Sequence, residues 1–288
     1  MIKARAKSLF IYPAVALSLL LSLVAAGFAL AGGPERAAWW GAAFAGLPLP
    51  FTLWRLRSGR IARTTENLPL ALLVACGGVF VAAWEWLMER VAGWPPLVVA
   101  SVSLLLLLLY VFWYSRYGRI GSSRLDVGGK LPEFSLQDAR GNRVASSELL
   151  GQPAVLVFYR GNWSPVCLAQ LREIAARHEE FAQLGSAVVF ISSQPAERTS
   201  ELAGQLDAPL AFWVDEGNTV AESLHIAVRD GVPAWQPGNY GRDTVMPTVV
   251  VTNANGTIVY ADQTDSYRVR PEPDVFLAIL RRAGAIAR

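Results

Sequence analysis

The feature that most limits how this chain can fold is residues 9–31, a run of 23 residues without a charged side chain. As a helix, such a run is long enough to cross about 30 Å of hydrocarbon. Further apolar runs cover 68–87 and 95–114, and a shorter one over 37–53 is broken by Pro48 and Pro50. We therefore expect an all-α transmembrane region of about four helices, with three as the alternative.

Charge divides the chain at about the same place. Residues 1–124 contain twelve Lys and Arg against four Asp and Glu, whereas residues 125–288 contain fourteen against nineteen. The basic residues of the first part flank its apolar runs instead of lining one face, which argues against a nucleic-acid partner. The sequence thus predicts a membrane region, 1–124, that contacts the lipid bilayer, and a water-soluble domain, 125–288.

The basic residues also predict an orientation, because cytoplasmic loops of membrane proteins are enriched in Lys and Arg. With four spans, two arginines lie on one side and ten basic residues on the other: Lys3, Arg5, Lys7, Arg55, Arg57, Arg60, Arg63, Arg116, Arg119 and Arg124. This favours a multi-pass protein of the cell (inner) membrane with both termini, and the soluble domain, on the cytoplasmic face. A cleavable signal peptide ending at Ala31 is the alternative, and it would leave three spans.

The soluble domain is organised around a strand, a turn and a helix. Residues 154–159 are an unbroken apolar run, typical of a strand buried on both faces. Beyond the turn, Pro165 suits the first turn of a helix, and Leu168 and Leu171 continue at helical spacing. Cys167 therefore lies at a helix start, where the positive end of the helix dipole favours a thiolate over a thiol.

The rest of the soluble domain alternates strands and helices. We expect a hairpin-like lead-in over 131–149, strands near 187–191, 210–214, 247–251 and 257–260, and helices near 197–206, 216–226 and 273–282. A loop is expected over 229–243, which is rich in Gly, Pro and Asp. The alternation predicts a three-layer α/β domain with a mixed sheet.

Several motifs give this domain a specific resemblance. They are Leu131-Pro-x-Phe-x-Leu, Phe158-Tyr-Arg-Gly-x-Trp-x-Pro-x-Cys167, Phe190-Ile-Ser-Ser-Gln194, Met246-Pro-Thr248 and Tyr260-Ala-Asp262 with Tyr267-Arg268. Together they resemble the thioredoxin-fold redoxins, and within them the peroxiredoxin-like branch (alkyl hydroperoxide reductase/thiol-specific antioxidant). The resemblance covers 125–288 and implies a thioredoxin-like fold and an attacking cysteine at position 167.

The sequence departs from both branches of these redoxins. Ser164 stands where a thioredoxin has the first cysteine of Cys-x-x-Cys, so this turn cannot supply a resolving thiol. It matches instead the Thr or Ser that peroxiredoxins have three residues before their cysteine. Arg160 stands where peroxiredoxins have a proline, and their arginine on a later strand is replaced by Pro247-Thr248, which resembles the cis-proline of thioredoxins.

The resemblance implies roles for several residues around Cys167. Arg160 is expected to supply the missing cation, polarising the peroxide O–O bond. Ser164 is expected to hold thiolate and peroxide together. The expected site wall or substrate-binding residues are Trp163, Pro247, Thr248 and Arg242.

The predicted function is a membrane-anchored thiol-dependent peroxidase that needs neither a metal nor a cofactor. The chain has two cysteines, and Cys76 lies mid-span beside Gly77-Gly78, where we interpret it as an inert small residue. Cys167 must therefore be recycled by an external thiol or a reducing protein, or pair with Cys167 of a second chain in a homodimer. A single-cysteine thiol–disulfide oxidoreductase acting on a disulfide substrate, and a non-catalytic redoxin-fold binding or sensor module, are the alternatives.

Overall fold

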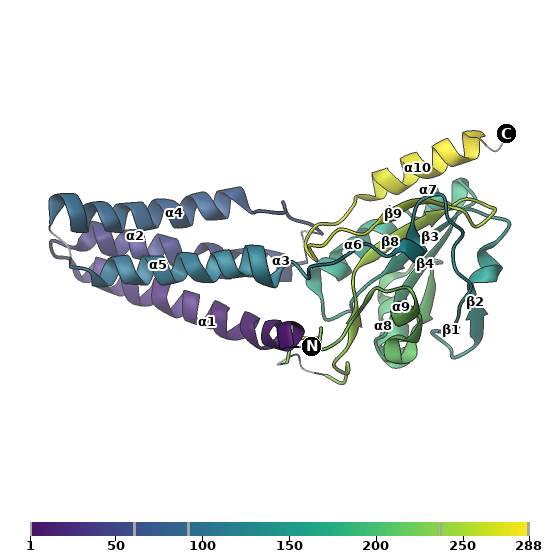
Figure 1. Ribbon diagram of the computed structural model, residues 1–288, viewed down its shortest axis with the longest axis horizontal. Coiled ribbons are helices and arrows are strands. Elements are labelled where there is room, and N and C mark those ends of the chain that lie inside the picture. Colours follow the sequence, from purple (N-terminus) through teal and green to yellow (C-terminus); the bar gives the residue numbers. More distant parts are fainter. Residues whose placement is uncertain (1, 60–61, 91–92, 235, 237, 287–288) are drawn as a thin grey trace. The chain divides into compact units, whose positions relative to one another are not determined.

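The computed structural model describes residues 2–59, 62–90, 93–234, 236 and 238–286 (Figure 1). The chain divides into two compact units. The helical unit is Leu9–Arg60 with Thr64–Tyr117, and the α/β unit is Gly118–Arg288 with Met1–Ser8 and Ile61–Arg63. The α/β unit thus takes in the linker residues 118–124, ahead of the boundary at 125 expected from composition.

The helical unit contains three helices that are long and apolar enough to cross a membrane, over Arg5–Ala31, Pro69–Glu89 and Pro95–Tyr114. Its helices are α1 (Ile2–Ala31), α2 (Arg36–Gly46), α3 (Pro48–Arg57), α4 (Pro69–Trp84) with η1 (Glu85–Glu89), and α5 (Pro95–Leu108) with η2 (Leu109–Tyr114). The weakest of the expected spans, 37–53, is divided between α2 and α3. The division falls at Leu47, since Pro48 has no N–H to continue the helical hydrogen bonds.

Close backbone contact holds α2 against α4. A Cβ atom added to Gly78 would lie 2.3 Å from the carbonyl oxygen of Gly41, so only glycine fits there. Hydroxyl groups of α1 contact α2, where Ser18 Oγ donates to Gly46 O at 2.9 Å and Ser22 Oγ donates to Ala43 O at 2.8 Å. Small residues and hydroxyl hydrogen bonds are how helices pack where water cannot drive association.

The α/β unit contains a seven-stranded mixed sheet in the order β2-β1-β5-β4-β3-β8-β9. The strands are β1 (Ser135–Asp138), β2 (Arg143–Ala145), β3 (Ala154–Phe158), β4 (Ala187–Ser192), β5 (Ala211–Val214), β8 (Thr248–Thr252) and β9 (Ile258–Asp262). The three central strands β3, β4 and β5 are parallel, whereas β8 and β9 pair antiparallel at one side and β1 and β2 at the other. This confirms the predicted mixed α/β sheet.

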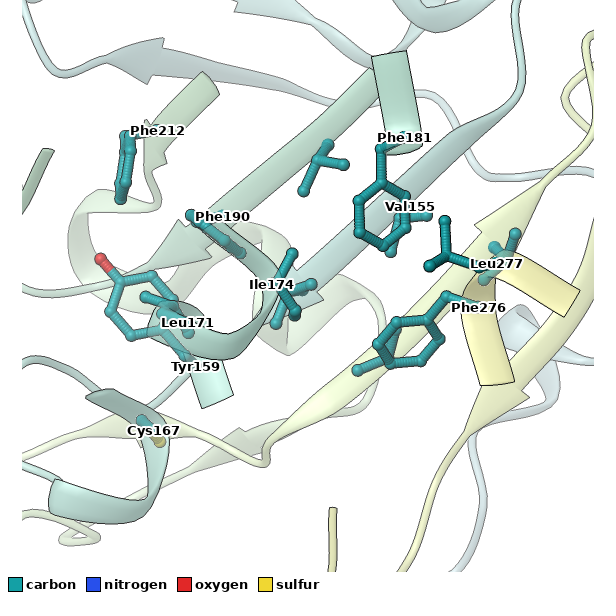
Figure 2. Close-up of a cluster of buried hydrophobic side chains, with 14 of the residues drawn as sticks. Val155, Tyr159, Cys167, Leu171, Ile174, Phe181, Phe190, Phe212, Phe276 and Leu277 are labelled. Atoms are coloured by element: carbon teal, nitrogen blue, oxygen red, sulfur yellow. The ribbon is translucent and has the colours of Figure 1, made fainter. Parts of the chain in front are cut away.

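Alternate residues of the central strands build the core on one face of the sheet. Val155 and Val157 of β3 lie with Phe190 of β4 against helices α6 (Pro165–Ala175), α7 (His178–Gln183) and α10 (Pro273–Ile286). Figure 2 shows Phe181, Phe276 and Leu277 on the side of the cluster near Val155, Ile174 in its middle, and Leu171 beside Tyr159. Helix α8 (Ala196–Leu206) adds Leu202 to the same cluster.

Two expected elements are shorter or more ordered than predicted. The helix expected over 216–226 is only η5 (Glu216–Asn218) and α9 (Thr219–Ser223), because Gly217 and Asn218 both have positive φ. The predicted loop 229–243 lies between β6 (Ala227–Val228) and β7 (Thr244–Val245), which pair antiparallel. This hairpin brings the loop back to the end of β3.

Candidate active site

The turn between β3 and α6 is specified by its own residues. Gly161 has a φ of 140°, and a Cβ there would lie 2.6 Å from Trp163 Nε1, so the turn needs glycine. The Ser164 N–H donates to Gly161 O at 3.1 Å, and Pro165 opens α6. Cys167 is consequently the third residue of α6, in the first turn as the sequence predicted.

The Cys167 side chain is fully buried and lies at the end of the hydrophobic core, near Tyr159 (Figure 2). Burial raises the pKa of the Tyr159 phenol, and the nearby charge of Cys167 raises it further. The Tyr159 Oη accepts a hydrogen bond from Gln194 Nε2 at 3.1 Å, and Gln194 Oε1 accepts one from Asn162 N at 2.7 Å. Gln194, which follows β4, thereby fixes the turn that precedes Cys167.

Arg160 is held as a buried cation directly before the turn. Its guanidinium lies over the rings of Trp163 and Tyr267, 4.5 and 5.3 Å from the ring centroids, and is 4% exposed. Nη2 donates to Gly231 O at 2.6 Å, and the backbone oxygen of Arg160 accepts a hydrogen bond from Thr244 Oγ1 at 2.7 Å. The hairpin formed by β6 and β7 therefore holds Arg160, which the sequence predicted to be the cation that polarises the peroxide.

A second buried arginine, Arg270, was missed by the sequence reasoning. Burial lowers the pKa of Arg270, while the charge of Cys167 acts in the opposite direction, as does that of Asp262. Nη1 donates to Val269 O at 3.4 Å, but Nε and Nη2 are buried without a hydrogen-bond partner in the described part of the chain. Arg270 also interacts electrostatically with Arg160, so it is linked to both Cys167 and the cation before the turn.

The predicted wall residues fall on the strand that pairs with β3. Thr248 is paired with Phe158 at the end of β3, and both Pro247 and Thr248 are buried. The expected cis bond at Pro247 is wrong, since the described residues contain no cis peptide bond. The trans form is the ordinary preference, and the chain runs from β7 directly into β8 without the tight turn that favours a cis bond.

Ser164 is buried beside Cys167 at the start of α6, but no side-chain hydrogen bond caps the helix. Arg242 is placed differently from the other candidates. Its side chain is 67% exposed and pairs with Asp230, Nη2 to Oδ1 at 2.7 Å. It lines a cavity of about 620 Å³ together with Asn218 and Tyr240. Its predicted role in substrate binding stays a prediction.

The comparisons with known proteins address this domain alone. Residues 127–261 match the sequence model of the AhpC/TSA family. This part of the chain is an AhpC/TSA family domain. Chloroplastic peroxiredoxin Q of Gentiana triflora is 29% identical over 144 residues, which cover 49% of this chain and 61% of the relative. Peroxiredoxin Bcp of Bacillus subtilis is 26% identical over 102 residues, covering 35% and 65%.

The chain thus spans less than two thirds of the length of these two relatives. Among solved structures, the peroxidoxin BcpB of Mycobacterium tuberculosis is 24% identical with a TM-score of 0.46, covering 55% of this chain and 97% of that one. The family match agrees with the predicted AhpC/TSA resemblance and with the thioredoxin-like, mixed-sheet architecture of the α/β unit. The AhpC/TSA domain carries Cys167, Arg160 and Ser164, whereas Arg270 lies nine residues beyond the matched segment.

Metal binding has no support from side-chain geometry in the described ranges. No group of three or more His, Cys, Asp or Glu side chains among these residues could hold a metal ion.

Proposed function

We propose that this protein is a membrane-anchored thiol peroxidase whose attacking group is Cys167. The Cys167 thiolate attacks the terminal oxygen of a hydroperoxide, an S–O bond forms and the O–O bond breaks. The departing alkoxide or hydroxide takes up a proton and leaves as an alcohol or water, and Cys167 becomes a sulfenic acid. The AhpC/TSA family match and the two peroxiredoxin relatives support this chemistry.

The observation that carries the proposal is the pair of buried arginines around Cys167. Removing an arginine from water is costly unless an anion or dipole compensates. Arg160 and Arg270 are each 4% exposed, and two nitrogens of Arg270 lack a hydrogen-bond partner among the described residues. A thiolate at Cys167, and then the negative charge that develops on the leaving oxygen, would meet both cations.

Burial of Cys167 also favours a peroxidase over a thiol–disulfide exchange protein. The side chain is 0% exposed, so a small hydroperoxide needs less opening of the site than a disulfide in a protein surface. Hydrogen peroxide should consequently react faster than cumene hydroperoxide, whose phenyl group must displace the turn around Trp163.

Recycling of Cys167 is assigned to an external thiol. The α/β unit has no second cysteine, and the other cysteine of the chain lies in the helical unit. One thiol attacks the sulfenic sulfur and releases water, and a second thiol reduces the resulting mixed disulfide. Burial of Cys167 in each chain disfavours a direct disulfide between two copies.

The three long apolar helices support membrane anchoring. We place both termini and the soluble domain in the cytoplasm on the Lys and Arg bias, with 37–53, divided between α2 and α3, as the fourth crossing that this topology requires. Reporter domains fused at residue 288, and in the connection between α4 and α5, would test the orientation. We expect a cytoplasm-dependent reporter to be active only at the C-terminus. Activity of a periplasm-dependent reporter at the C-terminus would overturn this topology.

The peroxidase proposal is tested by following peroxide consumption by the purified full chain. Without reductant, one equivalent of hydrogen peroxide should be consumed per chain, and added low-molecular-weight thiol should make consumption catalytic. Cys167→Ser should abolish both phases, whereas Cys76→Ser should leave them unchanged. Consumption that persists in Cys167→Ser, or its absence in the wild-type protein, would contradict the proposal.

A further inference from the structure

The linker that precedes the AhpC/TSA domain is built into the α/β unit. Ser122 N donates to Gln263 Oε1 at 2.6 Å, and Gln263 Nε2 donates back to Ser122 O at 3.2 Å. Leu125 is fully buried. Two further backbone hydrogen bonds join Gly128 and Gly129 to Ile258 of β9, each 2.8 Å long. Since β9 is an edge strand of the sheet, the linker covers that edge.

The linker places Arg119 beside Pro247 and Thr248, where β8 begins. Its Nη2 donates to Thr248 Oγ1 at 2.9 Å and to Gln263 Oε1 at 3.3 Å, and Nη1 donates to Pro247 O at 3.4 Å. The backbone N–H of Arg119 is held by Asp265 Oδ1 at 2.7 Å. An arginine from outside the family segment thus fastens the strand that pairs with the end of β3.

Arg119 also acts on the charges around Cys167. Burial lowers the pKa of Arg119 to about 10, still far above neutral pH, so the guanidinium keeps its charge. Arg119 and Arg270 interact electrostatically, as do Arg270 and Arg160. Three arginines from the linker, the Cys167 turn and the segment before α10 therefore form one cationic cluster.

We propose that Arg119 is a positioning residue for Cys167, so that the reactivity of the thiol depends on the docked linker. The inference rests on the proposed function, which makes Cys167 the reacting group. Arg119 acts in two ways. Its two-pronged guanidinium holds Pro247 O and Thr248 Oγ1 in place where β8 pairs with the end of β3, and its charge adds to the positive potential that favours the thiolate. The linker follows η2 in the chain.

The charged and titratable groups that face this cluster define the background for any pH-dependent measurement. In the described part of the α/β unit, they include Cys167 and Tyr159, the cations Arg119, Arg160 and Arg270, and the acids Asp262 and Asp265. Cys167 is the one thiol among them, so the rate of alkylation reports on Cys167.

The test compares linker variants of the full chain, all in a Cys76→Ser background so that Cys167 is the single thiol. The rate of alkylation by iodoacetamide is measured from pH 5.5 to 9, beside the rate of reaction with hydrogen peroxide. Arg119→Gln should slow both reactions at pH 7 by roughly tenfold and move the alkylation profile to higher pH. Arg119→Lys, which keeps the charge but loses the second prong, should fall between Arg119→Gln and wild type.

Arg124→Gln is the matched control, because Arg124 lies in the same linker with an exposed side chain. It should match wild type in both reactions. Gln263→Ala provides a second route, since it releases Ser122 and one prong of Arg119 without altering the arginine. It should shift the alkylation profile in the same direction by a smaller amount.

The outcomes separate this inference from the proposed function. Alkylation profiles of Arg119→Gln and Gln263→Ala that coincide with wild type would overturn the positioning role, whatever the peroxide rates. A wild-type protein that does not react with peroxide, but whose alkylation still depends on Arg119, would sink the peroxidase proposal and support the positioning role. If the alkylation profile of Arg119→Lys is shifted as far as that of Arg119→Gln, the role assigned to the charge of Arg119 is contradicted.

Discussion

The two cysteines of this chain present the same functional group in opposite surroundings. Cys76 is exposed on helix α4 of the helical unit, beside Gly77 and Gly78. Cys167 is buried in the α/β unit at a helix start. The apolar helix offers Cys76 no cation, whereas in the α/β unit the buried Arg270 interacts electrostatically with Cys167 and with Arg160.

The comparison teaches that the surroundings, more than accessibility, prepare a thiol for reaction. A thiolate is the nucleophilic form, and cations and helix starts favour it. Cys76 should react weakly although it is the exposed thiol. Cys167 should react faster although it is covered, because the charge that forms there is already compensated.

The largest effect on this contrast is expected from Arg270. Arg270→Gln should slow the reaction of Cys167 with hydrogen peroxide by about a hundredfold, the usual cost of losing one donor that stabilises developing charge. Stopped-flow kinetics of the full chain would measure it. Arg270→Lys should recover part of the rate. A rate for Arg270→Gln within twofold of wild type would show that Arg270 does not assist the reaction of Cys167.

A change in the packing of α2 against α4 should lower the stability of the helical unit and leave the reaction of Cys167 unchanged. Gly78→Ala brings a Cβ to 2.3 Å from Gly41 O, so α2 and α4 must move apart at a cost of about 1–3 kcal/mol. Gly77→Ala is the matched control, because a Cβ at Gly77 meets no atom within 4 Å. Thermal unfolding in detergent micelles should show a lower Tm for Gly78→Ala alone. Equal Tm values for the two variants would refute the close contact.

A smaller difference in the rate of reaction with peroxide is expected between variants of Arg160 and Arg242 in the α/β unit. Arg160→Gln should slow the reaction with peroxide by about tenfold, because its guanidinium is buried between two rings near Cys167. Arg242→Gln should change the rate by less than about twofold, because its side chain is exposed and screened by water. Second-order rate constants with hydrogen peroxide decide between them. A larger loss in Arg242→Gln than in Arg160→Gln would contradict the assignment of Arg160 as the cation that acts on the peroxide.

The smallest effect is on stability at alkaline pH. Burial raises the pKa of the Tyr159 phenol, and likewise raises that of Tyr260 to about 12. In the unfolded chain tyrosine ionises near pH 10, so stability from the neutral phenols is complete below about pH 10 and falls above it. Denaturation midpoints between pH 8 and 11 should fall less steeply in Tyr159→Phe than in wild type. Parallel curves would contradict this assignment.

The sequence predicted the main arrangement because its signals are local. The apolar run before Cys167, Pro165 and the helical spacing after it determine the strand, turn and helix without reference to the rest of the chain. The AhpC/TSA resemblance rested on those same residues, and the family match confirms it.

The remaining parts of the site depend on long-range contacts. Arg270 is 103 residues from Cys167 in the sequence and reaches it only through the packing of the segment after β9. Arg119 was counted among the basic residues at a membrane border, and nothing local indicated that it contacts Thr248. Tyr267-Arg268 was recognised as a family motif, and the arginine two residues later was the available but unused signal.

The most direct test of the central claim compares both cysteines in one molecule. The full chain is treated with one equivalent of hydrogen peroxide in the presence of a dimedone-type reagent, and each cysteine is quantified by peptide mass spectrometry. We predict rapid labelling at Cys167, slow labelling at Cys76, and loss of the rapid phase in Cys167→Ser. Labelling of Cys167 no faster than that of Cys76 would contradict the claim that its surroundings make Cys167 a peroxide-reactive thiol.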